Sequence, residues 1–157
     1  MRVGIGYDVH PFSANRPLVL GGVTVPHTSG LQGHSDADVL THALIDALLG
    51  AAALGDIGTH FPSEDERWRG ASSVNLLAKT RVILAEAGFG VANVDATIVA
   101  QAPKLAPHTQ AMRELLAQAL AVDPSTVSVK ATTTDRLGAI GRDEGIAAVA
   151  VALIDST

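Results

Sequence analysis

The chain has 157 residues and a formal net charge of −5, and 47% of its residues are hydrophobic. This composition excludes intrinsic disorder for the whole chain, and the length suits one domain covering residues 1–157. An isoelectric point near 5.6 and an aromatic content of 3% argue against a nucleic-acid partner. Because cysteine is absent, any metal must be held by histidine or carboxylate side chains.

The apolar segments of the chain are short. The N-terminal stretch MRVGIGYDVH contains no apolar run long enough for a secretory signal peptide. The most apolar windows, residues 47–54 and 146–154, are shorter than the roughly 20 residues that a membrane-spanning helix needs. We therefore expect a cytoplasmic protein without a membrane partner.

The first elements expected along the chain are a strand and a hairpin. Residues 2–9 alternate with the period of a strand, and the apolar face consists of Val3, Ile5, Tyr7 and Val9. Gly21-Gly22 lies between two short apolar runs, residues 18–20 and 23–25, which indicates a two-residue hairpin turn. A loop rich in glycine, serine and histidine follows.

Residues 39–53 have the spacing of the first long helix. Ser35 and Asp36 are candidate N-caps, with Asp38 three residues after Ser35 as in a capping box. We expect this helix to end at Gly55.

The remaining residues mix strands and helices. In chain order the sequence predicts a polar loop over 56–70, a helix over 73–87 ending at Gly88, a strand over 94–100, a helix over 107–122 and strands over 127–133 and 146–154. This mixture favours an α+β fold, with one sheet and helices laid on a face. The last strand is nearly all apolar, so we expect both its faces to be buried, with an oligomer supplying the second cover.

Three side chains form a candidate metal site. Asp8 and His10 leave the same face of the first strand, and His42 lies on the first helix. One carboxylate and two imidazoles are a suitable zinc set with an open fourth position. Asp38 or Asp46, one turn either side of His42, is expected to accept the second ring N–H of a ligand histidine.

Each of these patterns also has a structural explanation. A helical histidine is often packed or solvated, and an Asp-x-His pair arises by chance in many proteins. His34-Ser35-Asp36 precedes a helix N-terminus, where it suits an anion, but Ser35 also suits a simple cap. Residues 132–135, Thr-Thr-Thr-Asp, offer hydroxyls to a phosphate and a carboxylate to a hard cation, but threonines are also common on exposed strands.

Several segments together are specific for one family. They are GYDVHPF at 6–12, GHSDADVLTHALIDALLGAAALGDIG at 33–58, FP at 61–62, AQAPKL at 100–105, VKATTTD at 129–135 and GRDEGI at 141–146. In order and spacing they resemble the 2-C-methyl-D-erythritol 2,4-cyclodiphosphate synthases across essentially the whole chain. The resemblance implies a ferredoxin-like mixed sheet with helices on one face, in a homotrimer with active sites at the subunit interfaces.

The resemblance also implies the reaction, that of a phosphorus–oxygen lyase in non-mevalonate isoprenoid biosynthesis. The 2-phosphate of 4-diphosphocytidyl-2-C-methyl-D-erythritol 2-phosphate attacks the β-phosphorus, which releases CMP and closes a cyclic diphosphate. The substrate partner is thus a small cytidyl diphosphate.

Residue roles follow from the same resemblance. Asp8, His10 and His42 would hold one Zn²⁺ per subunit, and Asp135 would hold Mg²⁺ or Mn²⁺ between the substrate phosphates. His34 and Thr133 would stabilise the transferring group. The expected substrate contacts are Ser35 and Arg142 for phosphate, Asp56, Ile57, Gly58, Phe61, Pro62, Ser63, Glu64 and Asp65 for methylerythritol, and Ala100, Gln101, Ala102, Pro103, Lys104, Leu105, Ala106, Thr132 and Thr134 around the cytidyl diphosphate.

Three positions depart from the family pattern. Asp135 replaces an expected Glu and is one methylene shorter, Ser63 replaces a usual Asp, and Ala139 replaces a common Phe. None of these belongs to the predicted zinc site.

Two other functions fit parts of the pattern. A zinc-dependent hydrolase of small phosphate esters would use a metal-bound water, with His34 as the only candidate general base beside the site. A binding module would hold isoprenoid diphosphates in a central trimer cavity near Ala139, Arg142 and Glu144.

Overall fold

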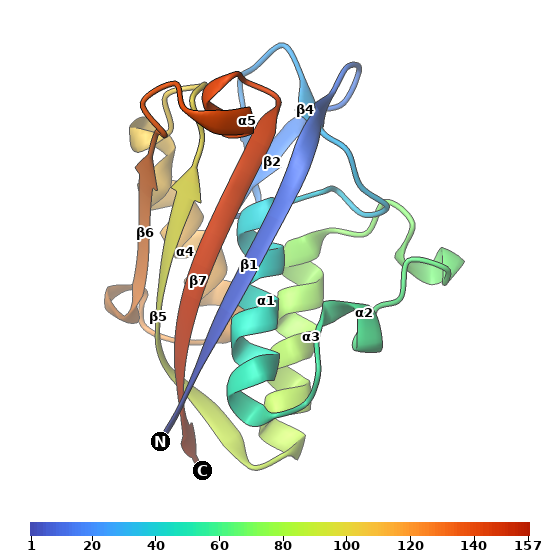
Figure 1. The fold of residues 1–157 in the computed structure, drawn as a ribbon. Helices are drawn as coiled ribbons and strands as arrows, with labels where there is room; N and C mark the ends of the chain where they lie inside the picture. The colour runs from blue at the N-terminus through green and yellow to red at the C-terminus, as the bar shows by residue number, and fades with distance from the viewer.

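A five-stranded sheet forms the frame of the molecule, which a computed structural model describes over residues 1–157 (Figure 1). In spatial order the strands are β4 (Gly30–Leu31), β1 (Arg2–Ser13), β7 (Gly145–Ser156), β5 (Phe89–Val99) and β6 (Val127–Thr132). The β5–β6 pair is parallel, and the other pairs are antiparallel. The expected mixed α+β architecture is therefore confirmed.

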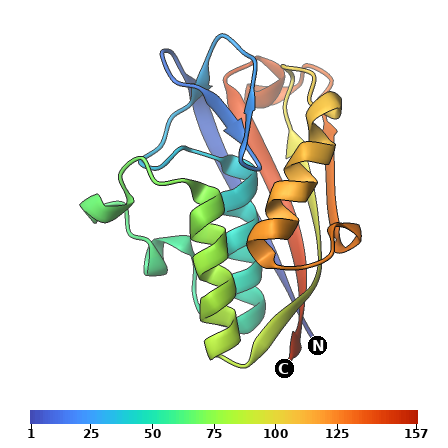
Figure 2. The same ribbon diagram turned by 180° about the vertical axis from the view of Figure 1, so that it is seen from behind.

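Three long helices cover one side of this sheet, as the view from behind shows (Figure 2). They are α1 (Val39–Ala52), α3 (Ser73–Glu86) and α4 (Thr109–Leu120). The smaller elements are the hairpin strands β2 (Leu18–Leu20) and β3 (Val23–Val25), the short helices α2 (Ile57–His60) and α5 (Gly138–Gly141), and 3-10 turns at Glu66–Trp68, Ala106–His108 and Pro124–Thr126. The chain ends lie together (Figure 1), and the N-terminal amine is 3.2 Å from a carboxylate oxygen of Asp155.

Two glycines of β1 bring α1 directly onto the sheet. A Cβ added at Gly4 would lie 2.0 Å from the carbonyl oxygen of Ala47, and one at Gly6 would lie 1.9 Å from that of Ala43. Neither position therefore tolerates a side chain without moving the helix. This close approach places the N-terminal half of α1 over the part of β1 that carries Asp8.

The apolar face of β1 points away from the helices and is open in the single chain. Ile5 is 71% exposed and Tyr7 is 60% exposed. The neighbouring strand β7 buries Ala148, Ala150 and Ala152 on its helix side, whereas Val151 on the other side is 40% exposed. Within one chain the helices cover only one face of β7, because all three helices lie on the same side, and the expected second cover from an oligomer stays a prediction.

The ends of α1 differ from the sequence prediction. Asp38, rather than Ser35 or Asp36, is the N-cap, and its carboxylate accepts a hydrogen bond from the Thr41 amide at 3.0 Å. The chain turns at Ala37 with a positive φ of 57°, so helical geometry begins only after this turn. The helix ends with Ala53 in the left-handed conformation, two residues before the expected Gly55.

The segment 56–70 contains local structure that its composition does not reveal. Asp56 caps α2 by accepting from the Thr59 amide at 2.8 Å, and Asp65 caps the following 3-10 turn by accepting from the Arg67 amide at 3.0 Å. Short polar elements of this kind are stabilised by side-chain caps, and their sequences show no apolar periodicity. The expected polar loop is therefore wrong in detail.

The other predicted elements are present with shifted ends. Strands β1, β5 and β7 extend beyond their predicted limits, and β6 ends at Thr132. The predicted helix over 107–122 is a 3-10 turn followed by α4, and α3 ends just before Gly88, which has a φ of +81°.

Candidate metal centre and adjoining pocket

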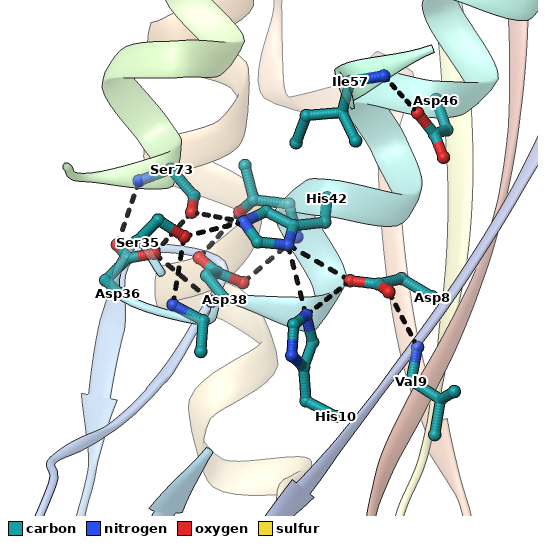
Figure 3. Close-up of polar contacts among 12 residues, drawn as sticks. Asp8, Val9, His10, Ser35, Asp36, Asp38, His42, Asp46, Ile57 and Ser73 are labelled. Atoms are coloured by element: carbon teal, nitrogen blue, oxygen red, sulfur yellow. Dashed lines mark hydrogen bonds and ion pairs between the residues drawn. The ribbon is translucent and has the colours of Figure 1, made fainter. Parts of the chain in front are cut away.

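The three predicted metal ligands meet where β1 passes under the N-terminal turns of α1 (Figure 3). Asp8 Oδ2 lies 2.8 Å from His10 Nε2 and 3.1 Å from His42 Nδ1. The two ring nitrogens are 3.3 Å apart. His42, 32 residues after His10 along the chain, thus presents its ligand atom to the same point as Asp8 and His10.

This donor set fits a tetrahedral metal ion. Zinc ligands about 2.0 Å from the ion in a tetrahedron lie roughly 3.3 Å from one another. The three separations in the structure are close to that value. His10 Nδ1 is 2.6 Å from the carbonyl oxygen of Gln32, which only accepts, so the His10 proton lies on Nδ1 and the Nε2 lone pair faces Asp8.

Asp38 and Asp46, which were expected to orient these histidines, accept hydrogen bonds from backbone amides instead. Asp38 accepts from the amides of Gly21 at 2.9 Å and Gly22 at 2.8 Å, in addition to its capping role. Asp46 accepts from the Ile57 amide at 2.8 Å and so ties α1 to α2. The prediction that either carboxylate contacts a ligand histidine is wrong, because backbone amides already occupy both.

Electrostatics at the centre favour a negative carboxylate. Burial by itself would raise the pKa of Asp8, but the His10 and His42 rings, which donate to this carboxylate in their doubly protonated forms, outweigh burial and lower the pKa from 3.8 to about 2. Burial lowers the pKa of His10, and the hydrogen bond with Asp8 raises it to a net value above 6.5. A carboxylate that stays ionised beside two imidazoles is suited to a cation.

A cavity of about 220 Å³ adjoins the centre. Its walls are His10, His34, Ser35, His42, Ile57, Gly58, Phe61, Ser63, Trp68 and Leu76. The ring nitrogens His34 Nε2 and Trp68 Nε1 are buried and have no hydrogen-bond partner within the chain. Buried polar groups are normally paired, so these two are available to a ligand.

The sequence reasoning missed four contributors to this region. Trp68 and Leu76 line the cavity, Gln32 orients His10, and Ser73 contacts His42. The single tryptophan of the chain, placed in a polar loop, was the one available signal.

A second cavity of about 440 Å³ lies at the ends of β5 and β6. Its walls are Ala100, Gln101, Pro103, Lys104, Leu105, Ala106, Ala131, Thr132 and Thr133. The structure thus brings the predicted 100–106 segment together with Thr132, the last residue of β6, and with Thr133 after it. This cavity shares no lining residue with the one beside the metal centre.

The remaining predicted residues lie outside both cavities. Asp135 is exposed at a left-handed position with a φ of +51°, and its amide donates to Thr133 Oγ1 at 3.2 Å. Arg142 Nε forms an ion pair of 2.8 Å with Glu144. Asp56 and Asp65 act as helix caps, and Pro62 and Glu64 lie in the segment between α2 and the following 3-10 turn. The last two are Ala102 and Thr134, and the Thr134 hydroxyl donates to the Leu137 carbonyl oxygen.

The family model described as the YgbB family matches residues 1–155. The chain belongs to the YgbB family. A relative from Synechocystis sp., named 2-C-methyl-D-erythritol 2,4-cyclodiphosphate synthase, is 58% identical over 154 residues, which are 98% of this chain and 96% of that protein. The resemblance inferred from the motifs is thereby confirmed.

Solved structures with this YgbB fold agree. The bifunctional IspDF from Campylobacter jejuni superposes with a TM-score of 0.96 at 46% identity, covering 99% of this chain and 42% of that larger chain. The IspF of Plasmodium falciparum, solved as a CDP complex, gives a TM-score of 0.87 at 31% identity, over 99% and 96% of the two chains. No helix of the present chain has the length and apolar character to cross a membrane.

Proposed function

We propose that this YgbB-family chain converts 4-diphosphocytidyl-2-C-methyl-D-erythritol 2-phosphate to 2-C-methyl-D-erythritol 2,4-cyclodiphosphate and CMP. The observation that carries the proposal is the convergence of Asp8, His10 and His42 at the wall of a cavity that also holds an unpaired His34 nitrogen. The enzyme would be a cytoplasmic phosphorus–oxygen lyase of non-mevalonate isoprenoid biosynthesis, as the name of its relatives implies.

Asp8, His10 and His42 would hold one Zn²⁺ per subunit. Asp135, exposed on the turn after β6, is the carboxylate available for Mg²⁺ or Mn²⁺. When bound, these ions supply positive charge to the phosphates, which a chain of net charge −5 does not offer from its own surface.

The chain's own donors hold the reacting groups. An oxygen of the 2-phosphate forms a bond to the β-phosphorus, and the bond from that phosphorus to the bridging oxygen of CMP breaks, so that CMP leaves with the electron pair. His34 Nε2 is free to donate to the transferring group, and Thr133 Oγ1 is exposed beside Asp135 for the same purpose. Such fixed donors stabilise charge that develops during phosphoryl transfer.

Substrate recognition divides between the two cavities. The cavity beside the metal centre would take the methylerythritol end, through Ser35 and residues 56–58 and 61–65. The cavity formed by residues 100–106 and Thr132 would take the cytidine, a role supported by the CDP complex of the Plasmodium falciparum relative. The proposed substrate contacts are completed by Ala102 within that segment, Thr134 after β6 and Arg142 at the end of α5.

The separation of the two cavities favours a homotrimer. A ferredoxin-like subunit with an open apolar face on β1 and β7 would bury that face against neighbouring copies. In such a trimer the cytidine cavity of one subunit would face the metal centre of the next, which completes the active site at each interface.

Phosphorus NMR of the purified protein with the cytidyl diphosphate substrate, Zn²⁺ and Mg²⁺ tests the proposal. We expect two coupled diphosphate resonances to appear together with CMP. Orthophosphate or a linear monophosphate would instead show a hydrolase, and an unchanged spectrum with metal bound would show a binding module. Full turnover in metal-free buffer would refute the role of the metal centre.

A further inference from the structure

We propose that Asp36 and Ser73 form a positioning pair that fixes the tautomer of His42, so that its Nδ1 presents a lone pair to the metal. This inference rests on the proposed metal centre and deepens it. The two residues come from different parts of the chain, since Asp36 precedes α1 and Ser73 is the first residue of α3. Figure 3 shows both residues on the side of the His42 ring that faces away from Asp8.

Ser73 is held rigidly by Asp36. The Ser73 side chain is fully buried, and its amide donates to Asp36 Oδ2 at 2.9 Å. Its hydroxyl donates to Asp36 Oδ1, the oxygen that also accepts from the Asp38 amide at 3.2 Å. The carboxylate thus captures both protons that Ser73 can offer and fixes the direction of its hydroxyl.

The position of the hydroxyl proton decides the state of His42. A serine hydroxyl has a single hydrogen, and here Asp36 receives it. Ser73 Oγ lies 2.8 Å from His42 Nε2 and is left to act as an acceptor, so the imidazole proton must be on Nε2. A neutral imidazole carries one proton, and Nδ1 therefore has a bare lone pair.

That lone pair points at the metal centre. His42 Nδ1 lies 3.1 Å from Asp8 Oδ2 and 3.3 Å from His10 Nε2, which also lacks a proton. Three acceptors directed at one another repel unless a cation lies among them. The Asp36–Ser73 pair thus performs for His42 the function that the Gln32 carbonyl performs for His10.

The same arrangement has a consequence for Ser35. Its Oγ lies 3.1 Å from His42 Nε2 and accepts from the Ala37 amide at 3.2 Å. Because His42 Nε2 is a donor, the hydrogen of the Ser35 hydroxyl has no acceptor within the chain. Ser35 lines the cavity, so this hydrogen is available to a phosphate oxygen of the substrate.

Zinc affinity measured by chelator competition on the full chain tests the pair. Removal of an outer partner of a metal ligand typically lowers affinity about 10–100-fold, and we expect this loss for Ser73→Ala. Ser73→Thr, which keeps the hydroxyl, should restore most of the affinity. Ser72→Ala is the matched control, because this neighbouring serine is exposed and makes no side-chain hydrogen bond. A folded Ser73→Ala protein that binds zinc as tightly as the natural chain would overturn the inference.

Nitrogen-15 NMR of the metal-free natural chain reports which ring nitrogen of His42 carries the proton. A purely structural role of Ser73 would not affect this protonation pattern. With the imidazole neutral, we expect the His42 proton on Nε2, and a proton on Nδ1 would overturn the inference even if Ser73→Ala fails to fold. In Asp36→Asn, whose amide nitrogen can donate to Ser73 Oγ, we expect a shift of the proton toward Nδ1. If the natural chain binds no zinc, the proposed metal centre fails, whereas normal zinc binding with the wrong tautomer refutes only the positioning pair.

Discussion

His10 and His42 meet edge to face, with ring centroids 5.3 Å apart and planes inclined by 64°. One ring comes from strand β1 and the other from helix α1, and neither donates a proton to the other, because each carries its proton on the far nitrogen. Gly4 and Gly6 of β1 allow the two rings to come together, because they let the backbone of α1 pack directly against the strand. The near nitrogens are therefore held apart at a ligand spacing before any metal arrives.

Loss of one ligand should abolish zinc binding without unfolding the chain. For His42→Ala we expect zinc affinity to fall at least about 100-fold, since outer partners alone account for about 10–100-fold. The imidazole is only partly buried, so the fold and the oligomer should persist. Metal analysis, turnover and sedimentation measure the three outcomes. Normal turnover with zinc absent would contradict the proposed role.

The Asp8–His10 pair should give the metal-free protein a defined pH dependence. The folded pKa of Asp8, about 2, lies below its ordinary 3.8, so its contribution to stability is present above pH 3.8 and is lost as pH falls toward 2. The folded pKa of His10 lies above 6.5, so its contribution is complete below pH 6.5 and is lost as pH rises through the folded value.

The two contributions overlap between pH 3.8 and 6.5, where the chelator-treated protein should gain most from the pair. Urea unfolding of the natural chain and of Asp8→Asn below pH 3.8, between pH 3.8 and 6.5, and above pH 6.5 measures how the difference in unfolding free energy falls off on either side of this range. A difference that does not change with pH would contradict the assignment.

The open face of β1 should be an interface between subunits. Ile5 is 71% exposed in the single chain. A charged side chain at this position would be buried in the oligomer, which would destabilise the interface by roughly several kcal/mol. We expect Ile5→Glu to be monomeric by sedimentation and to lose activity, because the proposed active site lies between two subunits. Val82→Glu is the matched control, since Val82 is an exposed apolar residue of α3 on the helix side. An intact trimer of Ile5→Glu would rule out this face.

Arg16 should position the loop that carries His34. Its guanidinium donates to the carbonyl oxygens of Gly33 at 2.6 Å and Ser35 at 2.7 Å, on either side of that histidine. Hydrogen bonds from charged groups contribute about 1.5–3 kcal/mol each, so Arg16→Ala should lower kcat roughly 10-fold or more. Zinc content should be unchanged, since Arg16 contacts no ligand. Steady-state kinetics beside metal analysis checks both statements, and equal loss of zinc and activity would contradict them.

Asp135 should determine the requirement for the second divalent ion. Its carboxylate is exposed on the turn after β6 and forms no ion pair, so the substitution Asp135→Ala should cost no more than about 1–2 kcal/mol of stability, through the left-handed backbone at this position. We expect a higher Mg²⁺ or Mn²⁺ concentration for half-maximal turnover, or no turnover. An unchanged metal titration would remove Asp135 from the reaction. Asp123→Ala is the control, because Asp123 is a surface carboxylate that caps a 3-10 turn.

Much of the site was predictable because its parts lie in short, contiguous motifs. Asp8 and His10 share a strand face by their spacing, and His42 lies on the helix that follows a loop rich in glycine, serine and histidine. The 100–106 segment and Thr132 at the end of β6 also line one cavity, as expected. The caps of α1 and the partners of the ligand histidines were not predictable, because several serines and aspartates near residue 38 have the same local chemistry, and only packing decides which of them receives which donor.

The amino-acid sequence by itself determined the mixed α+β class, the order of the main elements and the three candidate ligands, because periodicity and ligand chemistry are local properties. Tertiary structure decided which face of β1 meets the helices. The sequence pattern places Val3 and Ile5 on one face and Gly4 and Gly6 on the other, and apolarity favours burial of the first. The helix packs on the glycines instead, since only a face without side chains lets two backbones approach so closely, and this approach brings His42 within reach of Asp8.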